Sequence, residues 1–339
     1  MKKIVFSALV VAAAGLVVIC LIVGKTPKPV SSTYFLMDTV LTVKTTGKNA
    51  ETINRKLYAL ASGVDEMTSY YKPGSETARV NAAGGLPVTI SEEYSMLLKA
   101  ALHVQEIARG TKFDIAISPV SSLWGFTTKE FRVPTAEEIA QVLQYSHSDQ
   151  VILDGTTVTL HDARARIDLG GMAKGYSLDV MAEYLQKVQP QPEQVIVDFG
   201  GNLLLYSGGK KHNWKIGIRD PRGEGIIGYM VSDDAFVATS GDYQRYFESD
   251  GQRYCHIIDP VTGYPAVLNR SATVITSIKP MHAAIGDALG KVFFCSVPSD
   301  QEAEFEMTRQ DGVVGAVLID AEGHLSVLGN IAFAPESGT

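Results

Sequence analysis

A segment rich in glycine and carrying two charged residues is the first place in this sequence where a ligand could bind. It runs Asp168-Leu-Gly170-Gly171-Met-Ala-Lys174 and lies where an expected strand gives way to a long helix. Paired glycines let a ligand approach the backbone closely, and the free N–H groups at a helix start attract an anion. Lys174 in the first turn opposes the helix dipole, which indicates a binding site. The alternative is an ordinary tight turn with a surface lysine.

A histidine and an aspartate lie in apolar surroundings further along the chain. His256 belongs to Cys255-His-Ile-Ile258-Asp259, an apolar strand beside a turn, where a lone histidine is more often a structural residue of the core. Asp287 stands among alanines on an apolar helix. A carboxylate there is costly unless it is paired or binds a metal. Lys291 follows four residues later on the same helical face, so an ion pair is the alternative to a metal site.

Three other glycine-rich segments carry less information. The segments 198–202 (Asp-Phe-Gly-Gly-Asn) and 238–243 (Ala-Thr-Ser-Gly-Asp-Tyr) are turns at the ends of strands, and the second by itself is typical of a hairpin loop. Residues 223–228 match the pattern G-x-G-x-x-G of dinucleotide-binding proteins. That pattern requires a strand before it and a helix after it, whereas here a turn precedes and a strand follows. We interpret it as a surface hairpin loop.

The elements that must position these residues are helices and strands without regular βαβ alternation, so we predict an α+β fold. Apolar residues with helical spacing predict helices over 50–69, 91–109, 136–144, 172–188 and 281–296. Strands are expected over 34–44, 150–154, 157–161 and 164–168, through much of 194–278, and in a hairpin over 313–328.

Composition excludes several classes of protein. The chain has 339 residues, 45% of them hydrophobic and 20% charged, which is typical of a globular protein and argues against long disorder. Thirty basic and 37 acidic residues give a net charge of -7, which argues against nucleic-acid binding. Three cysteines without a C-x-x-C pair and seven histidines without H-E-x-x-H argue against a disulfide framework and a zinc site.

The N-terminus predicts export. Lys2 and Lys3 precede an uncharged run over 4–23, long enough to span the hydrocarbon core of a membrane. We therefore expect a membrane anchor over 1–24, a linker over 25–33 and one catalytic domain over 34–335. The positive flank would stay in the cytoplasm, which places the domain on the outer, periplasmic face of the cytoplasmic membrane. A cleaved signal peptide, or a lipoprotein processed at Cys20, are the alternatives, and both also export the domain.

Taken together, these segments resemble the ApbE family, the FAD:protein FMN transferases. The matches occur in order along nearly the whole expected domain. They are Tyr71-Lys-Pro-Gly-Ser-Glu76, Gly110-Thr-Lys-Phe-Asp114, Trp124-Gly-Phe126, the turn over 168–176, Gly200-Gly-Asn202, Thr239-Ser-Gly-Asp-Tyr243, the segment 256–263 and Asp287-Ala-Leu289.

The resemblance implies an ApbE-like mixed sheet with surrounding helices and a defined reaction. FAD is split at its pyrophosphate, and FMN passes to a threonine or serine hydroxyl of a target flavoprotein while AMP leaves. Mg²⁺ would neutralise the phosphate oxygens. The implied partner is a flavoprotein subunit of a membrane electron-transport complex.

The resemblance also implies a role for individual residues. His256 matches the histidine thought to accept the proton of the target hydroxyl, and its ordinary pKa suits that task. The metal ligands would be Gly171, Asp287 and Gly290. The residues implied to contact FAD are Met37, Tyr71, Lys112, Phe113, Asp114, Asp168, Lys174 and Ile258.

The sequence departs from the family pattern at two places. Where the family usually has Asp-Ala-Leu-Ser-Thr, with the threonine hydroxyl on the metal, this chain has Gly290 and Lys291 after Leu289. The ammonium of Lys291 would repel Mg²⁺, pair with Asp287 or replace the metal against the phosphates. The alternative function is therefore FAD binding, or hydrolysis of FAD to FMN and AMP, with weak transfer. Asp38 where glycine is common is a milder variation.

Overall fold

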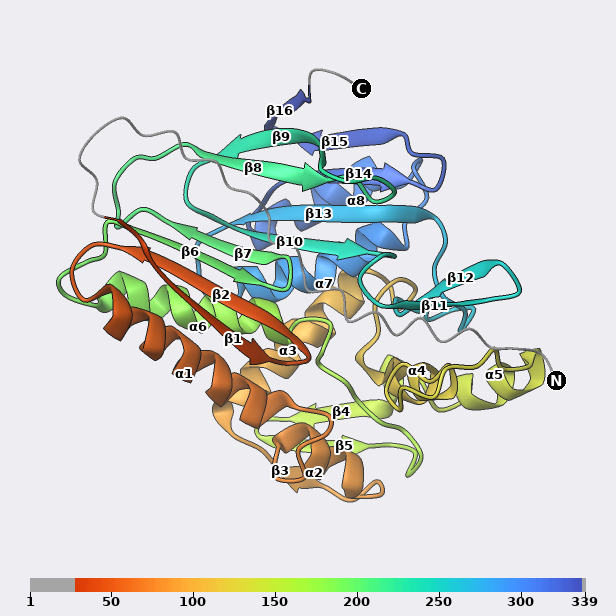
Figure 1. Ribbon diagram of the computed structural model, residues 1–339. Coiled ribbons are helices and arrows are strands. Elements are labelled where there is room, and N and C mark those ends of the chain that lie inside the picture. Colours follow the sequence, from red (N-terminus) through yellow and green to blue (C-terminus); the bar gives the residue numbers. More distant parts are fainter. Residues whose placement is uncertain (1–27, 337–339) are drawn as a thin grey trace.

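The structure is a computed structural model that describes residues 28–336. Its centre is one antiparallel sheet of eight strands (Figure 1). Every adjacent pair in this sheet is antiparallel. The order across the sheet is β1 (Val30–Leu36), β2 (Thr39–Thr46), β6 (Gln194–Phe199), β7 (Asn202–Tyr206), β10 (Ala235–Gly241), β13 (Asn269–Ser277), β14 (Val313–Asp320) and β15 (Leu325–Gly329).

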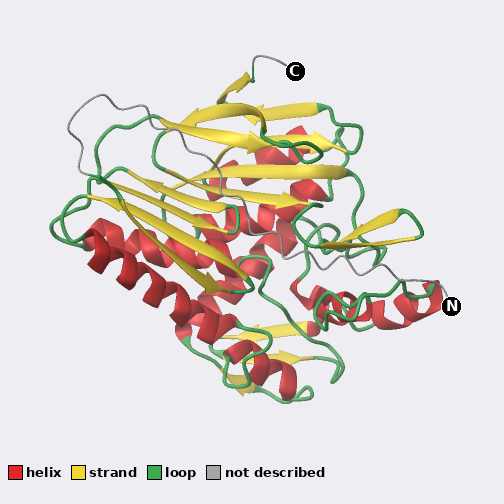
Figure 2. Cartoon of the chain, in the orientation of Figure 1, coloured by secondary structure: helices red, strands yellow, loops and turns green. Residues whose placement is uncertain are grey.

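Helices cover one face of the large sheet (Figure 2). Alternate residues of β6, among them Val195 and Val197, pack in one cluster with Leu57 and Leu185 from two of these helices. The helices are α1 (Ala50–Thr68), α2 (Glu76–Ala82), α3 (Glu92–Ile107), α4 (Ser118–Leu123), α5 (Ala136–Leu143), α6 (Ala173–Lys187), α7 (His282–Phe294) and α8 (Gln301–Thr308), with 3₁₀ turns η1 (Ile115–Ile117), η2 (Ser148–Gln150) and η3 (Arg309–Asp311).

A smaller sheet covers the opposite face. It has the order β16 (Ala332–Pro335), β9 (Ile226–Ser232) and β8 (Trp214–Arg219). Trp214 and Ile216 of β8 share a cluster with Leu203, Leu205 and Val237 of the large sheet. Because strand residues alternate between faces, the large sheet is buried on both sides and forms the rigid centre of the domain.

Two smaller units flank this body. The sheet β3 (Val88–Thr89), β5 (Thr157–Leu160) and β4 (Val151–Asp154) lies beside α2 and α3. The hairpin of β11 (Tyr246–Ser249) and β12 (Gln252–Cys255) lies at the same end of the molecule as α4 and α5 (Figure 1). Trp124 at the end of α4 contacts Phe247 and Tyr254 of this hairpin, which joins the two segments through aromatic packing.

Most of the predicted elements are present, with limited shifts at their ends. The helices predicted over 50–69, 91–109, 136–144, 172–188 and 281–296 correspond to α1, α3, α5, α6 and α7, and the hairpin over 313–328 to β14 and β15. The matching G-x-G-x-x-G segment does lie in a hairpin, with residues 223–225 in the turn between β8 and β9 and residues 226–228 at the start of β9. The α+β class is confirmed.

Two strand predictions are wrong. Residues 34–44 are not one strand but the hairpin of β1 and β2, because Met37 and Asp38 both adopt positive φ, 50° and 57°, and turn the chain. Residues 164–168 form no strand. Their backbone forms hydrogen bonds with side chains of other segments instead. For example, the Asn81 side chain accepts from the N–H of Ile167 and donates to its carbonyl.

Within residues 28–336, no helix is both long and apolar enough to cross a membrane. The anchor predicted over 1–24 and the lipidation site at Cys20 lie outside the described residues. The linker predicted over 25–33 is too long, because residues 30–33 already belong to β1 and pair with β2.

Candidate active site

Helices α6 and α7 are held together at their starts by unusually close contacts. A Cβ on Gly175 would lie 2.2 Å from the carbonyl oxygen of Ala283, so only glycine fits there. Asp179, one turn later on α6, accepts hydrogen bonds from the N–H groups of Ala283 and Ala284 at 3.1 and 2.8 Å. Since α7 has no side-chain cap of its own, Asp179 satisfies its first N–H groups from the neighbouring helix.

This pairing brings Asp287 of α7 against the start of α6. Asp287 is 1% exposed, and its Oδ2 accepts a hydrogen bond from the N–H of Gly175 at 3.1 Å. The ammonium of Lys174 lies 3.7 Å from the same oxygen. Lys291 forms an ion pair with Oδ1 and also donates to the main-chain carbonyl of Asp287 at 2.7 Å. The two segments singled out in the sequence therefore form one buried cluster of charges.

The charges in this cluster support one another. Burial raises the pKa of Asp287, but Lys174 and Lys291 outweigh that effect and hold the pKa below its usual value. Burial lowers the pKa of Lys291 to about 8, while Asp287 opposes the shift. One carboxylate thus faces two lysine side chains, and the cluster holds more basic than acidic groups.

His256 directly follows β12, and the charges of the same two lysines act on its ring. Its Nδ1 lies 3.2 Å from the carbonyl oxygen of Arg245, which can only accept, so Nδ1 carries the proton and Nε2 is the basic nitrogen. Burial lowers the pKa of His256 to about 3, and the charges of Arg245, Lys291 and Lys174 add to the shift. The ring is therefore neutral at physiological pH with its lone pair on Nε2, and it is a weaker base than the ordinary histidine pKa expected from the sequence.

Asp168 and Tyr71 also lie within reach of the charge of Arg245. Burial raises the pKa of Asp168. Three interactions oppose this rise: the hydrogen bond from the N–H of Gly170 and the charges of Arg245 and Lys174. Burial also raises the pKa of Tyr71, and Asp168 adds to that shift. The Tyr71 hydroxyl donates to the carbonyl of Thr127 at 3.1 Å, while half of its side chain stays exposed.

Arg245 is the residue of this site that the sequence analysis did not single out. Its guanidinium donates to the carbonyl of Phe126 at 2.7 Å, and its charge acts on His256, Asp168 and Tyr71. It lies in the turn before β11, where an arginine is indistinguishable in sequence from any surface residue. Its position eleven residues before His256 in a hairpin was the available signal, because the two strands return to the same point.

Four of the other predicted FAD contacts are placed by packing. Phe113 is buried with its ring against Gly171, where a Cβ would come within 3.1 Å of it. Asp114 is buried and caps η1 through the N–H of Ala116. Met37 sits at the turn of β1 and β2, packed against two clusters of the core. Ile258 is buried and pairs with Pro265 through a β-bridge.

Lys112 is not brought to the charged cluster. Its ammonium pairs with Glu304 of α8 and lies 3.7 Å from Asp300. Its charge acts instead on buried Cys295, where it opposes the rise of the thiol pKa caused by burial.

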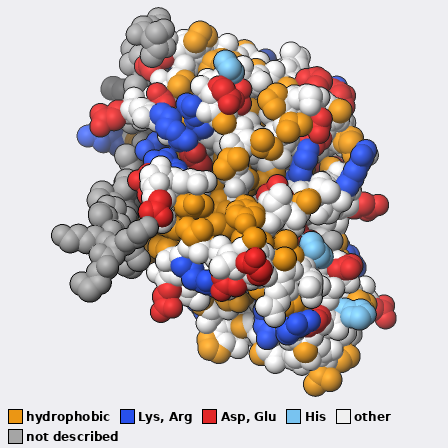
Figure 3. Space-filling model, turned by 90° about the vertical axis from the view of Figure 1, so that its right-hand side faces the viewer, with side chains coloured by type: hydrophobic (Ala, Val, Ile, Leu, Met, Phe, Trp, Pro, Cys, Tyr) orange, Lys and Arg blue, Asp and Glu red, His pale blue; other side chains and the backbone are white. Residues whose placement is uncertain are grey.

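Cys295 lines an open cleft of about 350 Å³ with the segment 264–268. Hydrophobic side chains gather at the surface of this end of the molecule (Figure 3).

The predicted metal ligands do not form a set suited to Mg²⁺. A hard divalent cation needs several free oxygens, yet both carboxylate oxygens of Asp287 already face an ammonium, and one also accepts an N–H. Gly290 lies inside α7, where carbonyl groups belong to the helical hydrogen-bond ladder, and its Cα packs against Ser240. Lys291 occupies the position that the expected ligand hydroxyl would need.

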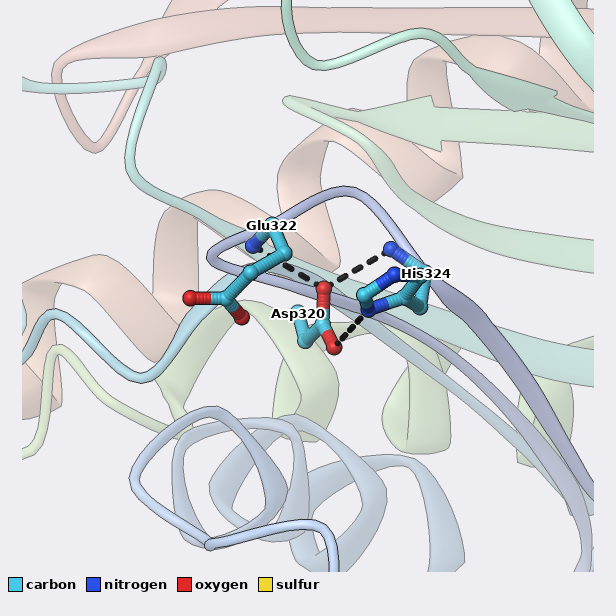
Figure 4. A group of neighbouring side chains, drawn as sticks. All are labelled: Asp320, Glu322 and His324. Atoms are coloured by element: carbon cyan, nitrogen blue, oxygen red, sulfur yellow. Dashed lines mark hydrogen bonds and ion pairs between the residues drawn. The ribbon is translucent and has the colours of Figure 1, made fainter.

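A second group of potential ligands lies at the turn between β14 and β15 (Figure 4). Asp320 Oδ1 accepts hydrogen bonds from the N–H groups of Glu322, Gly323 and His324 at 3.0, 2.7 and 2.7 Å. Its other oxygen pairs with the His324 ring at 2.9 Å. These bonds account for the group as a turn stabilised by one carboxylate.

Comparison with known proteins identifies the family. Residues 37–318 match the model of the ApbE family. The chain belongs to the ApbE family. It is 34% identical over 220 residues to the FAD:protein FMN transferase of Klebsiella pneumoniae, covering 63% of this chain and 67% of that protein. It is 31% identical over 248 residues to the enzyme of the same name from Vibrio cholerae, covering 71% and 73%.

Solved structures of the ApbE family have the same fold. The ApbE protein of Thermotoga maritima superimposes with a TM-score of 0.81 at 30% identity, covering 88% of this chain and 96% of that one. The flavin transferase ApbE of Vibrio cholerae gives a TM-score of 0.74 at 25% identity, covering 91% and 97%. The family resemblance inferred from the motifs is thus confirmed over nearly the whole described domain.

Proposed function

We propose that this chain is an FAD:protein FMN transferase, which moves FMN from FAD to a threonine or serine hydroxyl of a target flavoprotein. The observation that carries the proposal is the neutral His256 beside three cations, Lys174, Lys291 and Arg245. Transfer of a phosphoryl group to a hydroxyl needs a base for the proton and positive charge for the phosphate oxygens, and this site offers both.

The reaction proceeds by displacement at the phosphorus of the FMN half. The target hydroxyl oxygen forms a bond to this phosphorus, while the bond from phosphorus to the bridging pyrophosphate oxygen breaks. AMP leaves with the bridging oxygen and its electron pair. Nε2 of His256 takes the hydroxyl proton, because Nδ1–H is already engaged by the carbonyl of Arg245. Lys174 and Lys291 stabilise the charge that develops on the phosphate oxygens.

The remaining predicted contacts fit the binding of FAD around this point. Tyr71, half exposed beside Asp168, offers a ring face, and Met37 and Phe113 offer apolar surface. The glycine pair before α6 leaves the backbone accessible to a ligand. Magnesium is part of what the resemblance implies, but the donor set at Asp287 does not fit it, and no step above involves the metal.

We further propose that the domain works outside the cytoplasm, attached to the cytoplasmic membrane by its N-terminal segment or, in the alternative, by a lipid on Cys20. The apolar run over 4–23 after two lysines supports this location. The target is then a flavoprotein subunit of a membrane electron-transport complex.

Intact-mass analysis tests the transfer activity. The purified chain is incubated with FAD and a recombinant flavoprotein to which the Vibrio cholerae relative transfers FMN. AMP release is followed in parallel. Transfer predicts an acceptor heavier by one FMN less one water, with one AMP for each. Release of AMP and free FMN without this mass increase would instead identify an FAD pyrophosphatase, the alternative that Lys291 raised. Absence of both products would refute the proposal.

A further inference from the structure

The ammonium of Lys291 is held by two oxygens of a single residue. It donates to the main-chain carbonyl of Asp287 at 2.7 Å and pairs with the Oδ1 of the same residue. Only 16% of the Lys291 side chain is exposed, so the buried helix fixes its position. An ammonium carries three N–H groups, and two are used here. One N–H is left for an acceptor that enters the site.

Lys174 provides a second cation with more free donors. Its Nζ lies 3.7 Å from Oδ2 of Asp287, beyond hydrogen-bond distance, and it has no hydrogen-bond partner within residues 28–336. Its side chain is 23% exposed, which leaves a path for a ligand. Both lysines act on His256, so their charges lie beside the proposed base. Their free N–H groups suit an anion with several oxygens.

The charge of the cluster can be compared with that of the metal site that the resemblance implies. Asp287 with Lys174 and Lys291 sums to +1, whereas Asp287 with Lys174 and Mg²⁺ would sum to +2. Adding Mg²⁺ to the present cluster would place two further positive charges next to two ammonium groups in a buried site, where repulsion is weakly screened. Lys291 therefore already supplies one of the two positive charges expected from the metal.

We propose that Lys291, fixed by Asp287 and assisted by Lys174, binds the pyrophosphate of FAD in place of a divalent metal ion. FAD binding by this chain, and the FMN transfer that follows, then need no magnesium. The identity of the ligand rests on the proposed function, whereas the occupation of the metal position by Lys291 rests on the contacts of Asp287.

Equilibrium binding tests this proposal without relying on activity. The affinity of the full chain for FAD is measured by flavin fluorescence in EDTA and again with added MgCl₂, for the natural protein and for Lys291→Met. We expect equal affinities in both buffers for the natural protein. Lys291→Met should bind FAD about 10- to 100-fold more weakly in EDTA, the usual effect of losing a hydrogen bond to a charged group. Riboflavin, which lacks the pyrophosphate, should bind both proteins equally.

Three further variants separate charge from structure. Lys291→Arg keeps a cation and should retain most of the affinity in EDTA, whereas Lys291→Thr should bind FAD tightly only with MgCl₂. Lys187→Met is the control: it removes the exposed lysine that pairs with Glu183 at the same i,i+4 spacing, and it should leave the affinity for FAD unchanged in both buffers. If Lys291→Met does not fold, the double variant Lys291→Met/Asp287→Asn, which removes both buried charges, replaces it with the same expected loss.

Two results would overturn the proposal. One is an FAD affinity of the natural protein that rises tenfold or more with MgCl₂. The other is an unchanged FAD affinity of the folded Lys291→Met protein in EDTA. Failure of the proposed function has a different signature, because binding of FAD without AMP release would leave this inference standing and refute the transfer activity.

Discussion

The N–H of Gly175 donates to Oδ2 of Asp287 over 3.1 Å and so joins the start of α6 to the middle of α7. The two residues are 112 positions apart in sequence. The bond forms because Gly175 has no Cβ, which lets α6 approach the carbonyl of Ala283 closely. One backbone contact thus places Lys174 beside the carboxylate that also holds Lys291, and the positive site depends on how tightly these two helices pack.

Substitution of His256 tests the proposed base. His256→Ala should lower the rate of FMN transfer about 10²- to 10⁴-fold and leave the affinity for FAD nearly unchanged, because the ring accepts a proton but does not carry the phosphate charge. Single-turnover kinetics with mass detection of the acceptor measure the rate. His324→Ala, at the exposed β14–β15 turn, is the matched control. A rate equal to that of the natural protein would make His256 a structural residue.

The pH dependence of transfer should lack the usual histidine step. Because the pKa of His256 is lowered to about 3, the neutral base is already present throughout pH 5–8. On the acid side we expect kcat/KM for FAD to show no inflection near pH 6.5 and to fall only below about pH 4. A pH–rate profile in buffers of constant ionic strength checks this, and a break between pH 6 and 7 would contradict it.

The same shift predicts how the stability of the fold changes with pH. The unfolded chain protonates His256 near pH 6.5, whereas the folded chain resists protonation down to about pH 3. The unfolded state therefore binds more protons in this window, and stability declines as pH falls through it. Compared with the natural protein, His256→Gln should lose less stability between pH 6.5 and pH 4.5 in urea titrations. Parallel curves for the two proteins would count against a neutral His256 in the folded state.

The contact between α6 and α7 can be tested by adding one methyl group. Gly175→Ala should lower the free energy of unfolding by about 1–3 kcal/mol, because its Cβ meets a backbone carbonyl that cannot turn away. Gly63→Ala is the matched control, since Gly63 is exposed within α1 and has no atom within 4 Å of its Cβ position. That substitution should stabilise the protein by about 0.5–1 kcal/mol. Equal effects in urea denaturation would show that the close approach is unimportant.

Asp179 should be essential for the start of α7. Asp179→Ala leaves the N–H groups of Ala283 and Ala284 buried without an acceptor, and we expect a loss of about 1–3 kcal/mol in stability. Asp179→Asn keeps one acceptor oxygen and should recover part of this loss. Thermal unfolding of the three proteins gives the comparison. If Asp179→Ala unfolds like the natural protein, the cap is not needed.

The sequence by itself determined the α+β class, most helices and the family. These follow from local signals: apolar periodicity marks α1, α3, α6 and α7, the capping residue Ser91 marks the start of α3, and the ordered motifs span the domain. The short helices α2 and α8 were missed because seven or eight residues carry little periodicity, whereas the equally short α5 was recognised from its start at Thr135. The turn at Met37 and Asp38 was missed because neither residue is the glycine that usually marks positive φ.

Only the tertiary structure decided which candidates act together. Spacing along α7 allowed Lys291 to pair with Asp287, to face solvent or to leave room for a metal, and the packing of α6 against α7 selected the ion pair. The β11–β12 hairpin brought Arg245 beside His256, and the position of α8 directed Lys112 to Glu304. The physical reason is that charge and burial are long-range properties. They depend on which helix or strand covers a side chain, and residues far apart in sequence supply that cover.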